Sequence, residues 1–368
     1  MKVMKRELQI VDTHTHTDPD AKLSGCFCKV PFNEFHIYRD GYVSNCCFSW
    51  LPTELGNVHS QTLLQMSENA ISQRIKESVQ NGRFNHCNSS FCPSLNQVLH
   101  DGSLTWPLEP KETFKKIHST ELHKHFRIYL SFDFSCNLTC ESCRIEKVYF
   151  DRQNASPELL ATYERVREQI QELLEKGYQL DLNITGSGDA FASPLYYELM
   201  SELPQTKNLN LSISTNGTMM TEKKLNLPTK NQIRTIFVSV DSCRPETYAK
   251  LRRGGKFEHV QSNLDSLNQM VKSNFFSNFY WQINFIVQND NFQELGDFVD
   301  WSKRYDTLHS VAFSKILDWK HLSPAIFQEK AVWMKDHPNH QSFVERLQDR
   351  RLRDQRVILG NLSEYLRQ

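Results

Sequence analysis

Three cysteines, Cys136, Cys140 and Cys143, lie within a run of eight residues. The spacing Cys-x3-Cys-x2-Cys offers three thiolates to one metal cluster. A [4Fe–4S] cluster normally takes four thiolates, so a loop that supplies three leaves one iron free to bind a small molecule. Structural zinc instead takes four ligands, usually from two closely spaced pairs, and no second pair follows at the usual distance. The spacing favours an open iron–sulfur cluster, with zinc or three metal-free cysteines as alternatives.

The other cysteines are also concentrated early in the chain. Nine of the ten precede residue 144, and only Cys243 lies beyond it. The amino terminus lacks the apolar segment of a signal peptide, so we expect a reducing, cytoplasmic environment in which disulfides are rare. Metal ligation therefore explains the cysteines better than disulfides do, and their clustering predicts two cysteine-bearing sites.

The length and the charge of the chain limit the classes of protein to consider. At 368 residues it is large enough for two domains or for one barrel with an appendage. Lysine plus arginine and aspartate plus glutamate both total 43, which gives a formal net charge of zero. No overall field attracts nucleic acid or an anionic membrane, and no apolar stretch is long enough to span a membrane. We expect neither nucleic acid nor membrane as a partner.

Short β-rich runs alternate with helical patterns from about residue 126 onward, which is typical of βα units and a parallel sheet. The helix after the cysteine loop has clear ends, with Ser156 as N-cap, Pro157 at the first position and Gly177 at the end. Two helices, over about 322–336 and 341–357, are expected to close the chain. The six predicted strands are 126–133, 179–185, 208–214, 235–240, 278–287 and 308–314.

Ligands of parallel α/β folds bind where the loops after the strands converge. The cysteine loop follows the first predicted strand. It resembles the loop of the radical S-adenosylmethionine (SAM) superfamily, whose free iron is chelated by the amino and carboxylate groups of SAM, and Asn137 and Leu138 match its commonest form. The resemblance implies a partial (β/α)6 barrel of the TIM type. Many relatives have an aromatic residue before the third cysteine, whereas this chain has Ser142, so the adenine contact is left unassigned.

Loops after the later strands also resemble segments that hold SAM in this superfamily. The run that includes Gly186, Ser187, Gly188 and Asp189 is similar to a Gly-Gly-Glu-Pro segment that binds the SAM amino group. Asn216 and Ser239 end two further strands, near the places of the ribose and the carboxylate. Each could instead be ordinary turn or cap chemistry. Arg252 lies in a stretch similar to one in peptide-modifying relatives, where a planar guanidinium can pair with the SAM carboxylate.

The amino-terminal cysteines resemble those of SPASM and twitch domains, which bind auxiliary iron–sulfur clusters. A glycine turn precedes Cys46 and a Gly-Asn segment follows, as in that family, although such domains usually come after the barrel. Four thiolates would saturate a second [4Fe–4S] cluster, but they would also suit structural zinc. The expected ligands are Cys28, Cys46, Cys87 and Cys92, with Cys26 and Cys47 as possible substitutes.

A rival hypothesis comes from Asp12, His14 and His16, which resemble the Asp-x-His-x-His opening of metal-dependent amidohydrolases. That family also needs histidines and an aspartate at later strand ends, where this chain has Cys, Gly, Asn and Ser. Unplaced motif matches are usually accidental. A non-enzymatic zinc or iron–sulfur binding protein is the third class, and it would not require glycine and serine loops at successive strand ends.

The resemblance implies that the chain cleaves SAM reductively to a 5′-deoxyadenosyl radical, which abstracts hydrogen from a substrate. Implied partners are SAM, a flavodoxin- or ferredoxin-type electron donor, and a small molecule, a sugar or a peptide as substrate. Cys243 would give epimerisation if its thiol quenches the product radical, and oxidation is expected if the second cluster takes an electron. The predicted divisions are a tail at 1–25, an auxiliary domain at 26–105, a core barrel at 106–320 and a helical cap at 321–368.

Overall fold

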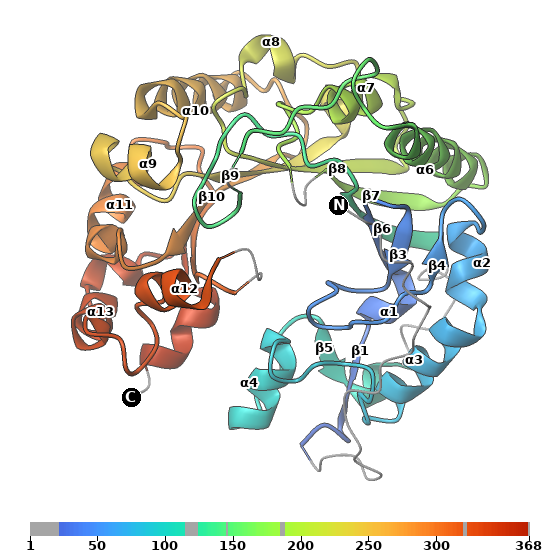
Figure 1. Ribbon diagram of the computed structural model, residues 1–368, viewed down its shortest axis with the longest axis horizontal. Helices are drawn as coiled ribbons and strands as arrows, with labels where there is room; N and C mark the ends of the chain where they lie inside the picture. The colour runs from blue at the N-terminus through green and yellow to red at the C-terminus, as the bar shows by residue number, and fades with distance from the viewer. Residues whose placement is uncertain (1–21, 115–123, 145, 185–187, 319–321, 367–368) are drawn as a thin grey trace. The chain divides into compact units, whose positions relative to one another are not determined.

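The computed structural model describes residues 22–114, 124–144, 146–184, 188–318 and 322–366. The fold is mixed α/β with a mostly parallel sheet, which confirms the predicted fold class. Two compact units can be separated (Figure 1). Unit 1 consists of Met1–Asp133, Arg152–Gly186 and Thr206–Asn210, and unit 2 consists of Phe134–Asp151, Ser187–Gln205 and Leu211–Gln368. Within the described residues, no helix is long and apolar enough to cross a membrane.

Unit 1 combines the amino-terminal cysteine block with two strands of the predicted barrel. Strand β2 lies parallel to β6, which lies parallel to β7, while β3 and β4 extend the sheet in the antiparallel direction. A separate antiparallel pair is formed by β1 and β5. The strands of unit 1 are β1 (Cys26–Cys28), β2 (Glu34–Tyr38), β3 (Tyr42–Ser44), β4 (Gly56–Asn57), β5 (Leu108–Pro110), β6 (His125–Ser131) and β7 (Gln179–Ile184). Its helices are α1 (Val30–Asn33), α2 (Leu63–Glu68), α3 (Ala70–Gln80), α4 (Pro93–Asp101), η1 (Lys111–Thr113) and α6 (Pro157–Glu175).

Unit 2 contains the later βα units. Neighbouring strands from β8 to β12 are all parallel. The strands are β8 (Leu209–Thr215), β9 (Ile233–Ser239), β10 (Tyr280–Val287), β11 (Ser310–Lys315) and β12 (Val357–Ile358). The helices are α7 (Pro194–Glu202), α8 (Glu222–Leu225), η3 (Lys230–Gln232), α9 (Pro245–Leu251), α10 (Phe257–Lys272), η4 (Phe292–Glu294), α11 (Leu295–Ser302), α12 (Pro324–Lys330), α13 (His340–Leu347), η5 (Arg350–Arg353) and η6 (Gly360–Leu366).

Buried and partly buried residues alternate along the strands, and this alternation determines which face of the sheet is apolar. In β6, Phe126, Ile128 and Leu130 are buried, and the residues between them are only partly buried. Strand β10 follows the same rule, with Trp281, Ile283, Phe285 and Val287 fully buried. Successive side chains of a strand point to opposite faces, so one face of each sheet carries the apolar core and the other carries the remaining side chains.

All six predicted strands are present within two residues of their predicted ends. Helix α6 also forms as predicted: the Ser156 hydroxyl accepts a hydrogen bond from the Leu159 N–H at 3.2 Å, and Gly177 follows the helix with a φ of +78°. Such a positive φ suits glycine because it has no Cβ.

The two long helices predicted at the carboxyl end are wrong. Only the short helices α12 and α13 form there, and Val357–Ile358 becomes a strand that pairs in parallel with β11. Pro338 separates the two helices, and proline cannot continue a helix because it lacks an N–H group. The tertiary pairing with β11 then includes Val357, the last residue of the second predicted helix.

Candidate functional site

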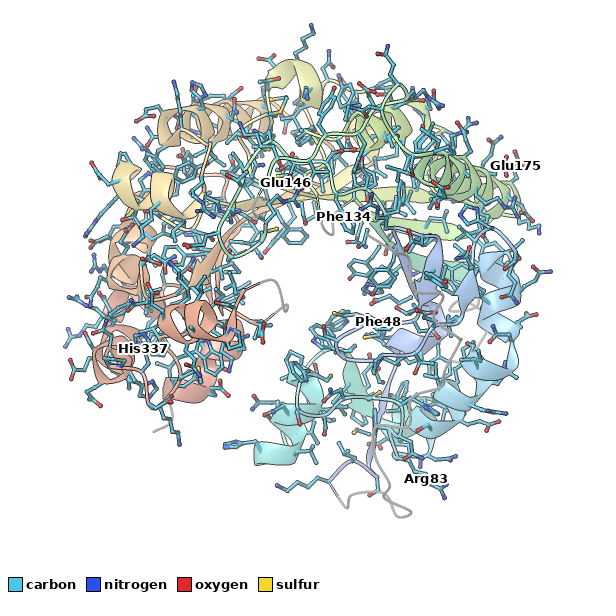
Figure 2. The ribbon with its side chains drawn as sticks, in the orientation of Figure 1. Phe48, Arg83, Phe134, Glu146, Glu175 and His337 are labelled. Carbon is cyan, nitrogen blue, oxygen red and sulfur yellow. The ribbon has the colours of Figure 1, made fainter. Side chains whose placement is uncertain are left out.

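The loop that holds Cys136, Cys140 and Cys143 belongs to unit 2 and begins at Phe134, which is labelled in Figure 2. The Cys136 N–H donates to the Val148 carbonyl at 2.7 Å, so these two residues form an isolated antiparallel bridge across the loop. The N–H group of Cys143 donates to the Cys140 carbonyl at 2.9 Å, which folds the second and third cysteines into one turn. The three thiols are therefore carried by a single, internally bonded loop.

Two of these sulfurs receive hydrogen bonds from other loops. Asn216 donates through Nδ2 to Cys136 Sγ at 3.7 Å, and Arg252 donates through a guanidinium nitrogen to Cys140 Sγ at 3.9 Å. Burial raises the pKa of Cys140, and the positive charge of Arg252 opposes that rise. Cys143 is the exposed member of the three. Donors aimed at sulfur stabilise a thiolate, which is the form that ligates metal.

Asp189 is a positioning residue that braces this arrangement. Its carboxylate accepts four hydrogen bonds, from the N–H groups of Phe191, Ala192 and Asn216 and from the Thr215 hydroxyl, at 2.6–3.0 Å. Burial raises its pKa, and the same four donors oppose that rise. All four interactions are internal, so Asp189 fixes Asn216 beside Cys136, whereas its own contact with SAM stays a prediction.

Arg252 lies in a buried group with Asp241 and Tyr248. Its guanidinium is 2.6 Å from Asp241 Oδ2, and the two side chains are 13% and 7% exposed. Asp241 also accepts from the Ile286 N–H at 2.7 Å. Within the described residues, the buried Arg252 Nε and Tyr248 hydroxyl have no hydrogen-bond partner. Buried polar groups are normally satisfied, so two unsatisfied donors beside the cysteine loop fit a bound polar group such as SAM.

The other predicted SAM contacts lie at strand ends or outside the described residues. Ser239 is the last residue of β9 and pairs in register with Asn284. Gly188 is described and half-buried, whereas Gly186 and Ser187 fall outside the described residues. Asp12, His14 and His16 of the rival hydrolase motif also lie outside the described part of the chain.

Cys243 is half-buried and faces a carboxylate. Its thiol donates to Glu294 Oε2 at 3.5 Å, and its N–H donates to the same oxygen at 3.0 Å. Burial, reinforced by the negative charge of Glu294, raises the pKa of Cys243 to about 12. The group therefore stays a protonated thiol at neutral pH.

The amino-terminal cysteines are brought together from separate segments of unit 1. Cys28 ends β1, Cys46 follows β3, and Cys92 is the N-cap of α4. Hydrogen bonds from the Asn88 N–H to the Trp50 carbonyl at 2.7 Å and from the Cys92 N–H to the Asn88 carbonyl at 2.9 Å link the segments after Cys47 and Cys87. Phe48, labelled in Figure 2, lies in the first of these segments. All ten cysteines of the chain are described, and all are free thiols.

Electrostatic coupling separates four of these thiols from the other two. Burial raises the pKa values of Cys28, Cys46, Cys87 and Cys92, and every pair among the four adds mutual repulsion between thiolates. Of the other two, Cys26 is coupled to Cys28 and Cys47 to Cys92, so each is coupled to one member of the quartet, and the Cys26 thiol donates to the Leu23 carbonyl at 3.3 Å. Thiolates that repel one another need a cationic core to remain ionised together, so this quartet fits a metal cluster. Its identity as the ligand set stays a prediction.

The hairpin beside this quartet depends on a glycine. Gly41 lies between β2 and β3 with a φ of +79°, and a Cβ there would come within 2.8 Å of the Asn57 side-chain oxygen. Among the described residues, no three His, Cys, Asp or Glu side chains are arranged to hold a single metal ion. The fit of iron–sulfur clusters therefore rests on the sulfur donors, the unsatisfied polar groups and the coupled thiols.

Sequence analysis missed the polar faces of the sheets. In unit 1, Glu34 is 2.9 Å from the His36 ring and 3.5 Å from Arg127, and His36 stacks on Tyr129 with ring centroids 4.3 Å apart. Beside them, Asp181 of β7 pairs with His125 at 2.7 Å. A parallel sheet is usually apolar on both faces, so this charged face departs from the usual pattern.

Unit 2 has a corresponding polar row. The Ser310 hydroxyl donates to Gln282 Oε1 at 2.8 Å, and Gln282 Nε2 donates to Asn284 Oδ1 at 2.7 Å. Tyr280 shares a 2.5 Å hydrogen bond with Ser310. The sequence did contain a signal for both polar rows, because polar residues occur at every second position of the predicted strands.

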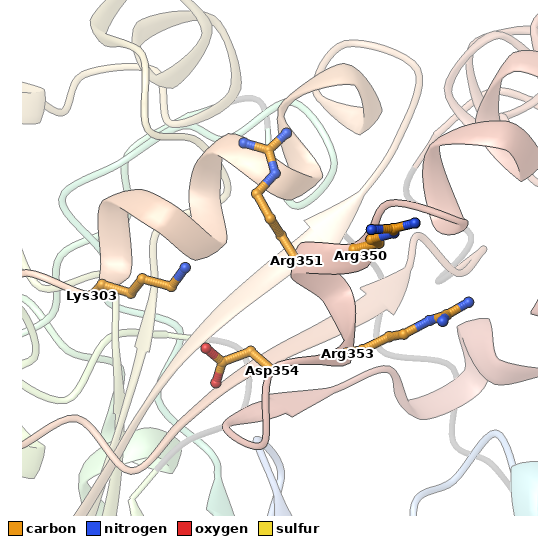
Figure 3. A pocket seen from close by; sticks show the side chains of 5 residues that line it. All are labelled: Lys303, Arg350, Arg351, Arg353 and Asp354. Atoms are coloured by element: carbon orange, nitrogen blue, oxygen red, sulfur yellow. The ribbon is translucent and has the colours of Figure 1, made fainter.

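A shallow cavity of about 390 Å³ lies elsewhere in unit 2 (Figure 3). It is lined by Lys303, Arg350, Arg351, Arg353 and Asp354. Arg351 is held by Asp297, Asp300 and Asp349 at 2.7–3.0 Å, and Lys303 pairs with Asp300 at 2.7 Å. Much of its positive charge is therefore already neutralised, and the ion pairs attach η5 to α11.

Comparison with protein families identifies both cysteine regions. Residues 131–301 match the radical SAM superfamily, and residues 26–93 match SPASM, an iron–sulfur cluster-binding domain. The first match contains Cys136, Cys140 and Cys143, and the second contains all six amino-terminal cysteines. The cofactors are therefore a [4Fe–4S] cluster with SAM and a second iron–sulfur cluster.

Solved structures with similar folds include SuiB of Streptococcus suis bound to SAM, with 12% identity, a TM-score of 0.40, and coverage of 70% of this chain and 54% of SuiB. SuiB bound to its precursor peptide SuiA has 12% identity and a TM-score of 0.39, and the match covers 80% of this chain and 63% of SuiB. HydG, a maturase of the [FeFe]-hydrogenase, has 13% identity and a TM-score of 0.34, and the match covers 56% of this chain and 46% of HydG. The chain thus spans about half to two thirds of these proteins. The search of curated proteins gave no match.

Proposed function

The chain combines a radical SAM domain with an SPASM iron–sulfur domain, and on that premise we propose that it catalyses the two-electron oxidation of a polar substrate. Radical SAM membership implies an enzyme. In this proposal Cys136, Cys140 and Cys143 hold the cluster that binds SAM, and Cys28, Cys46, Cys87 and Cys92 hold the second cluster. When bound, the first cluster and SAM supply a 5′-deoxyadenosyl radical that can remove a hydrogen atom from the substrate.

The observation that carries the proposal is the convergence of two side-chain donors on the sulfurs of the three-cysteine loop. Asn216 and Arg252 come from loops about 80 and 110 positions further along the chain, yet each reaches one of the sulfurs. Hydrogen bonds to cluster sulfurs are one of the means by which a protein sets the reduction potential of a cluster.

The residues around SAM have separable tasks in this proposal. Asp189 orients the Asn216 backbone, and Asp241 holds the Arg252 guanidinium. Asp241 lies at one terminal nitrogen of the guanidinium and Cys140 at the other, so Nε and the second N–H of each terminal nitrogen are the donors of Arg252 left for the SAM carboxylate. Tyr248 offers a second buried donor at the same place.

In this proposal the second cluster makes the reaction an oxidation, because it accepts an electron from the substrate. After losing a hydrogen atom, the substrate must release one electron and one proton to complete a two-electron oxidation. The mutually coupled cysteine quartet supports a fully ligated cluster, which suits electron acceptance better than substrate binding. A ferredoxin- or flavodoxin-type protein is the proposed external electron donor.

The substrate is proposed to be polar because of the polar faces of the strands. In unit 2, which also carries the three-cysteine loop, Gln282, Asn284 and Ser310 offer hydrogen-bonding groups of both kinds. An apolar substrate would cover this polar face and remove its remaining contacts with water, which is unfavourable.

Epimerisation is the second candidate, and it rests on Cys243. Its raised pKa keeps the thiol protonated, which is the form that can donate a hydrogen atom. The thiol is directed at Glu294, however, so oxidation is preferred.

The test is anaerobic reconstitution, followed by measurement of iron, sulfide and zinc and a dithionite-driven assay for 5′-deoxyadenosine. Two [4Fe–4S] clusters correspond to about eight irons per chain. We expect that value together with SAM cleavage. Tightly bound zinc without SAM cleavage would contradict the proposal.

A further inference from the structure

Lys330, the last residue of α12, is a buried lysine in unit 2. Its side chain is only 5% exposed. Lysine is almost never fully buried unless it is paired, because removing its charge from water is costly. The burial of Lys330 therefore requires specific partners within the fold.

Those partners are two carboxylates from distant parts of the sequence. Lys330 Nζ is 2.6 Å from Asp290 Oδ2 and 2.9 Å from Glu141 Oε2. Burial by itself would lower the pKa of Lys330, but the two carboxylates outweigh it and the pKa is raised. Asp290, 8% exposed, also pairs with Lys250, and the Lys330 carbonyl accepts the Asn289 N–H at 2.9 Å. The ammonium thus joins α12 to the loop after β10 and to Glu141.

Glu141 lies between the second and third cysteines of the cluster loop. The Cys140–Cys143 turn has backbone hydrogen bonds of its own. Nearby, the Thr139 N–H donates to the Arg253 carbonyl at 2.9 Å, and Arg253 Nε donates to the Thr139 carbonyl at 3.0 Å. These bonds secure the start of the turn, whereas the ion pair of Glu141 with Lys330 holds its middle.

We propose that Lys330 is a positioning residue that fixes the Cys140–Cys143 turn through Glu141 and adds a positive charge beside the cluster. The inference rests on the proposed function because it assigns these cysteines to the SAM cluster. Lys330 belongs to the predicted helical cap at 321–368, and this part of the chain would then take part in forming the site. A loosened turn would bind its cluster less firmly, and a missing ammonium would make a cluster of negative charge harder to reduce.

The first test is hydrogen exchange of residues 134–151 in the full-length, cluster-free protein. Lys330→Met keeps the length of the side chain and removes its charge, while Asp290 retains Lys250. Glu141→Gln removes the other half of the pair at a position that is 32% exposed, so it is expected to fold. We expect exchange in the loop to be about tenfold faster in both variants, as for a local opening that has lost a constraint.

Lys335→Met is the matched control, since Lys335 is an exposed lysine on the same segment. It should exchange like the wild type. The double variant of Lys330 and Glu141 should be no faster than Lys330→Met alone, because Lys330→Met already removes the ion pair with Glu141. Unchanged exchange in Glu141→Gln, or additive effects in the double variant, would overturn the proposal.

The second test uses the reconstituted protein. Lys330→Met should lower the midpoint potential of the SAM cluster, measured by redox titration with electron paramagnetic resonance, and should speed the loss of iron to a chelator. A wild type that binds no iron would contradict the proposed function, but the exchange comparison would still decide whether Lys330 positions the loop.

Discussion

The two cysteine regions both bring several thiols together, but they do so in opposite ways. Cys136, Cys140 and Cys143 lie in one loop, and two of their sulfurs receive side-chain donors. The quartet of Cys28, Cys46, Cys87 and Cys92 is gathered from four segments, and burial dominates its environment. The first region is local and open to a ligand, whereas the second is assembled by the fold and closed. The difference suggests that one cluster reacts while the other stores an electron.

The largest expected effect comes from removing the local site. Replacing Cys136, Cys140 and Cys143 together by alanine should abolish formation of 5′-deoxyadenosine, because no protein ligand of the SAM cluster remains. Iron should fall from about eight to about four per chain, since the quartet keeps its own cluster. Iron analysis with the dithionite assay checks both values. Loss of all the iron would show that the two regions are not independent.

A variant of the quartet of Cys28, Cys46, Cys87 and Cys92 should lose a different function. Cys46→Ala removes a member of the coupled quartet, so we expect about four irons per chain and loss of substrate oxidation, while 5′-deoxyadenosine is still formed. Cys47→Ala is the matched control, because Cys47 is the adjacent half-buried thiol outside the quartet. Iron content and separate assays of the two products test this expectation. Equal iron loss in both variants would mean that the quartet is wrongly chosen.

A smaller effect is expected from the donors to sulfur. Asn216→Ala removes the hydrogen bond to Cys136 and the bond to Asn137 at 3.0 Å. Loss of a group that orients a metal ligand typically costs about 10- to 100-fold in metal affinity or activity, so SAM cleavage should slow within that range. Asn226→Ala, at an exposed position, serves as control. If Asn216→Ala cleaved SAM at the wild-type rate, the side-chain donors to sulfur would no longer distinguish the two cysteine regions.

The smallest effect concerns stability alone. Ser156→Ala removes the N-cap of α6, which should lower the free energy of unfolding by about 1 kcal/mol. Urea denaturation of the cluster-free protein measures it. Because α6 contributes no cysteine, the iron content of both regions should stay unchanged. A loss of iron in this variant would mean that cluster retention reports general stability.

The local site could be predicted from the sequence because its information is local. Three thiols within eight residues remain near one another whatever the fold does, and the strands around them are marked by periodicity. Asn216 was also predicted to contact the cofactor, because polar residues just after parallel strands meet at one edge of the sheet, and Arg252 was predicted from the resemblance of its stretch to one in radical SAM enzymes. Their hydrogen bonds to sulfur were not foreseen, since a side-chain direction depends on its packing.

The ion pair between Glu141 and Lys330 could not be predicted in the same way. Its two residues are 189 positions apart, and each resembles an ordinary surface charge in the sequence. The strand Val357–Ile358 was missed for a similar reason, because its pairing with β11 depends on the tertiary structure. Interactions over such distances depend on which segments the fold brings together.

The sequence by itself determined the three-cysteine loop, the order of six strands and the capped helix α6, because spacing, alternation and capping act over a few residues. Only the tertiary structure decided that Asp189 would be used internally, that Arg252 would lie between Asp241 and Cys140, and that one quartet of thiols would be coupled. Those outcomes depend on burial and on contacts between distant segments, which set the energy of a charge far more strongly than its neighbours in the chain do.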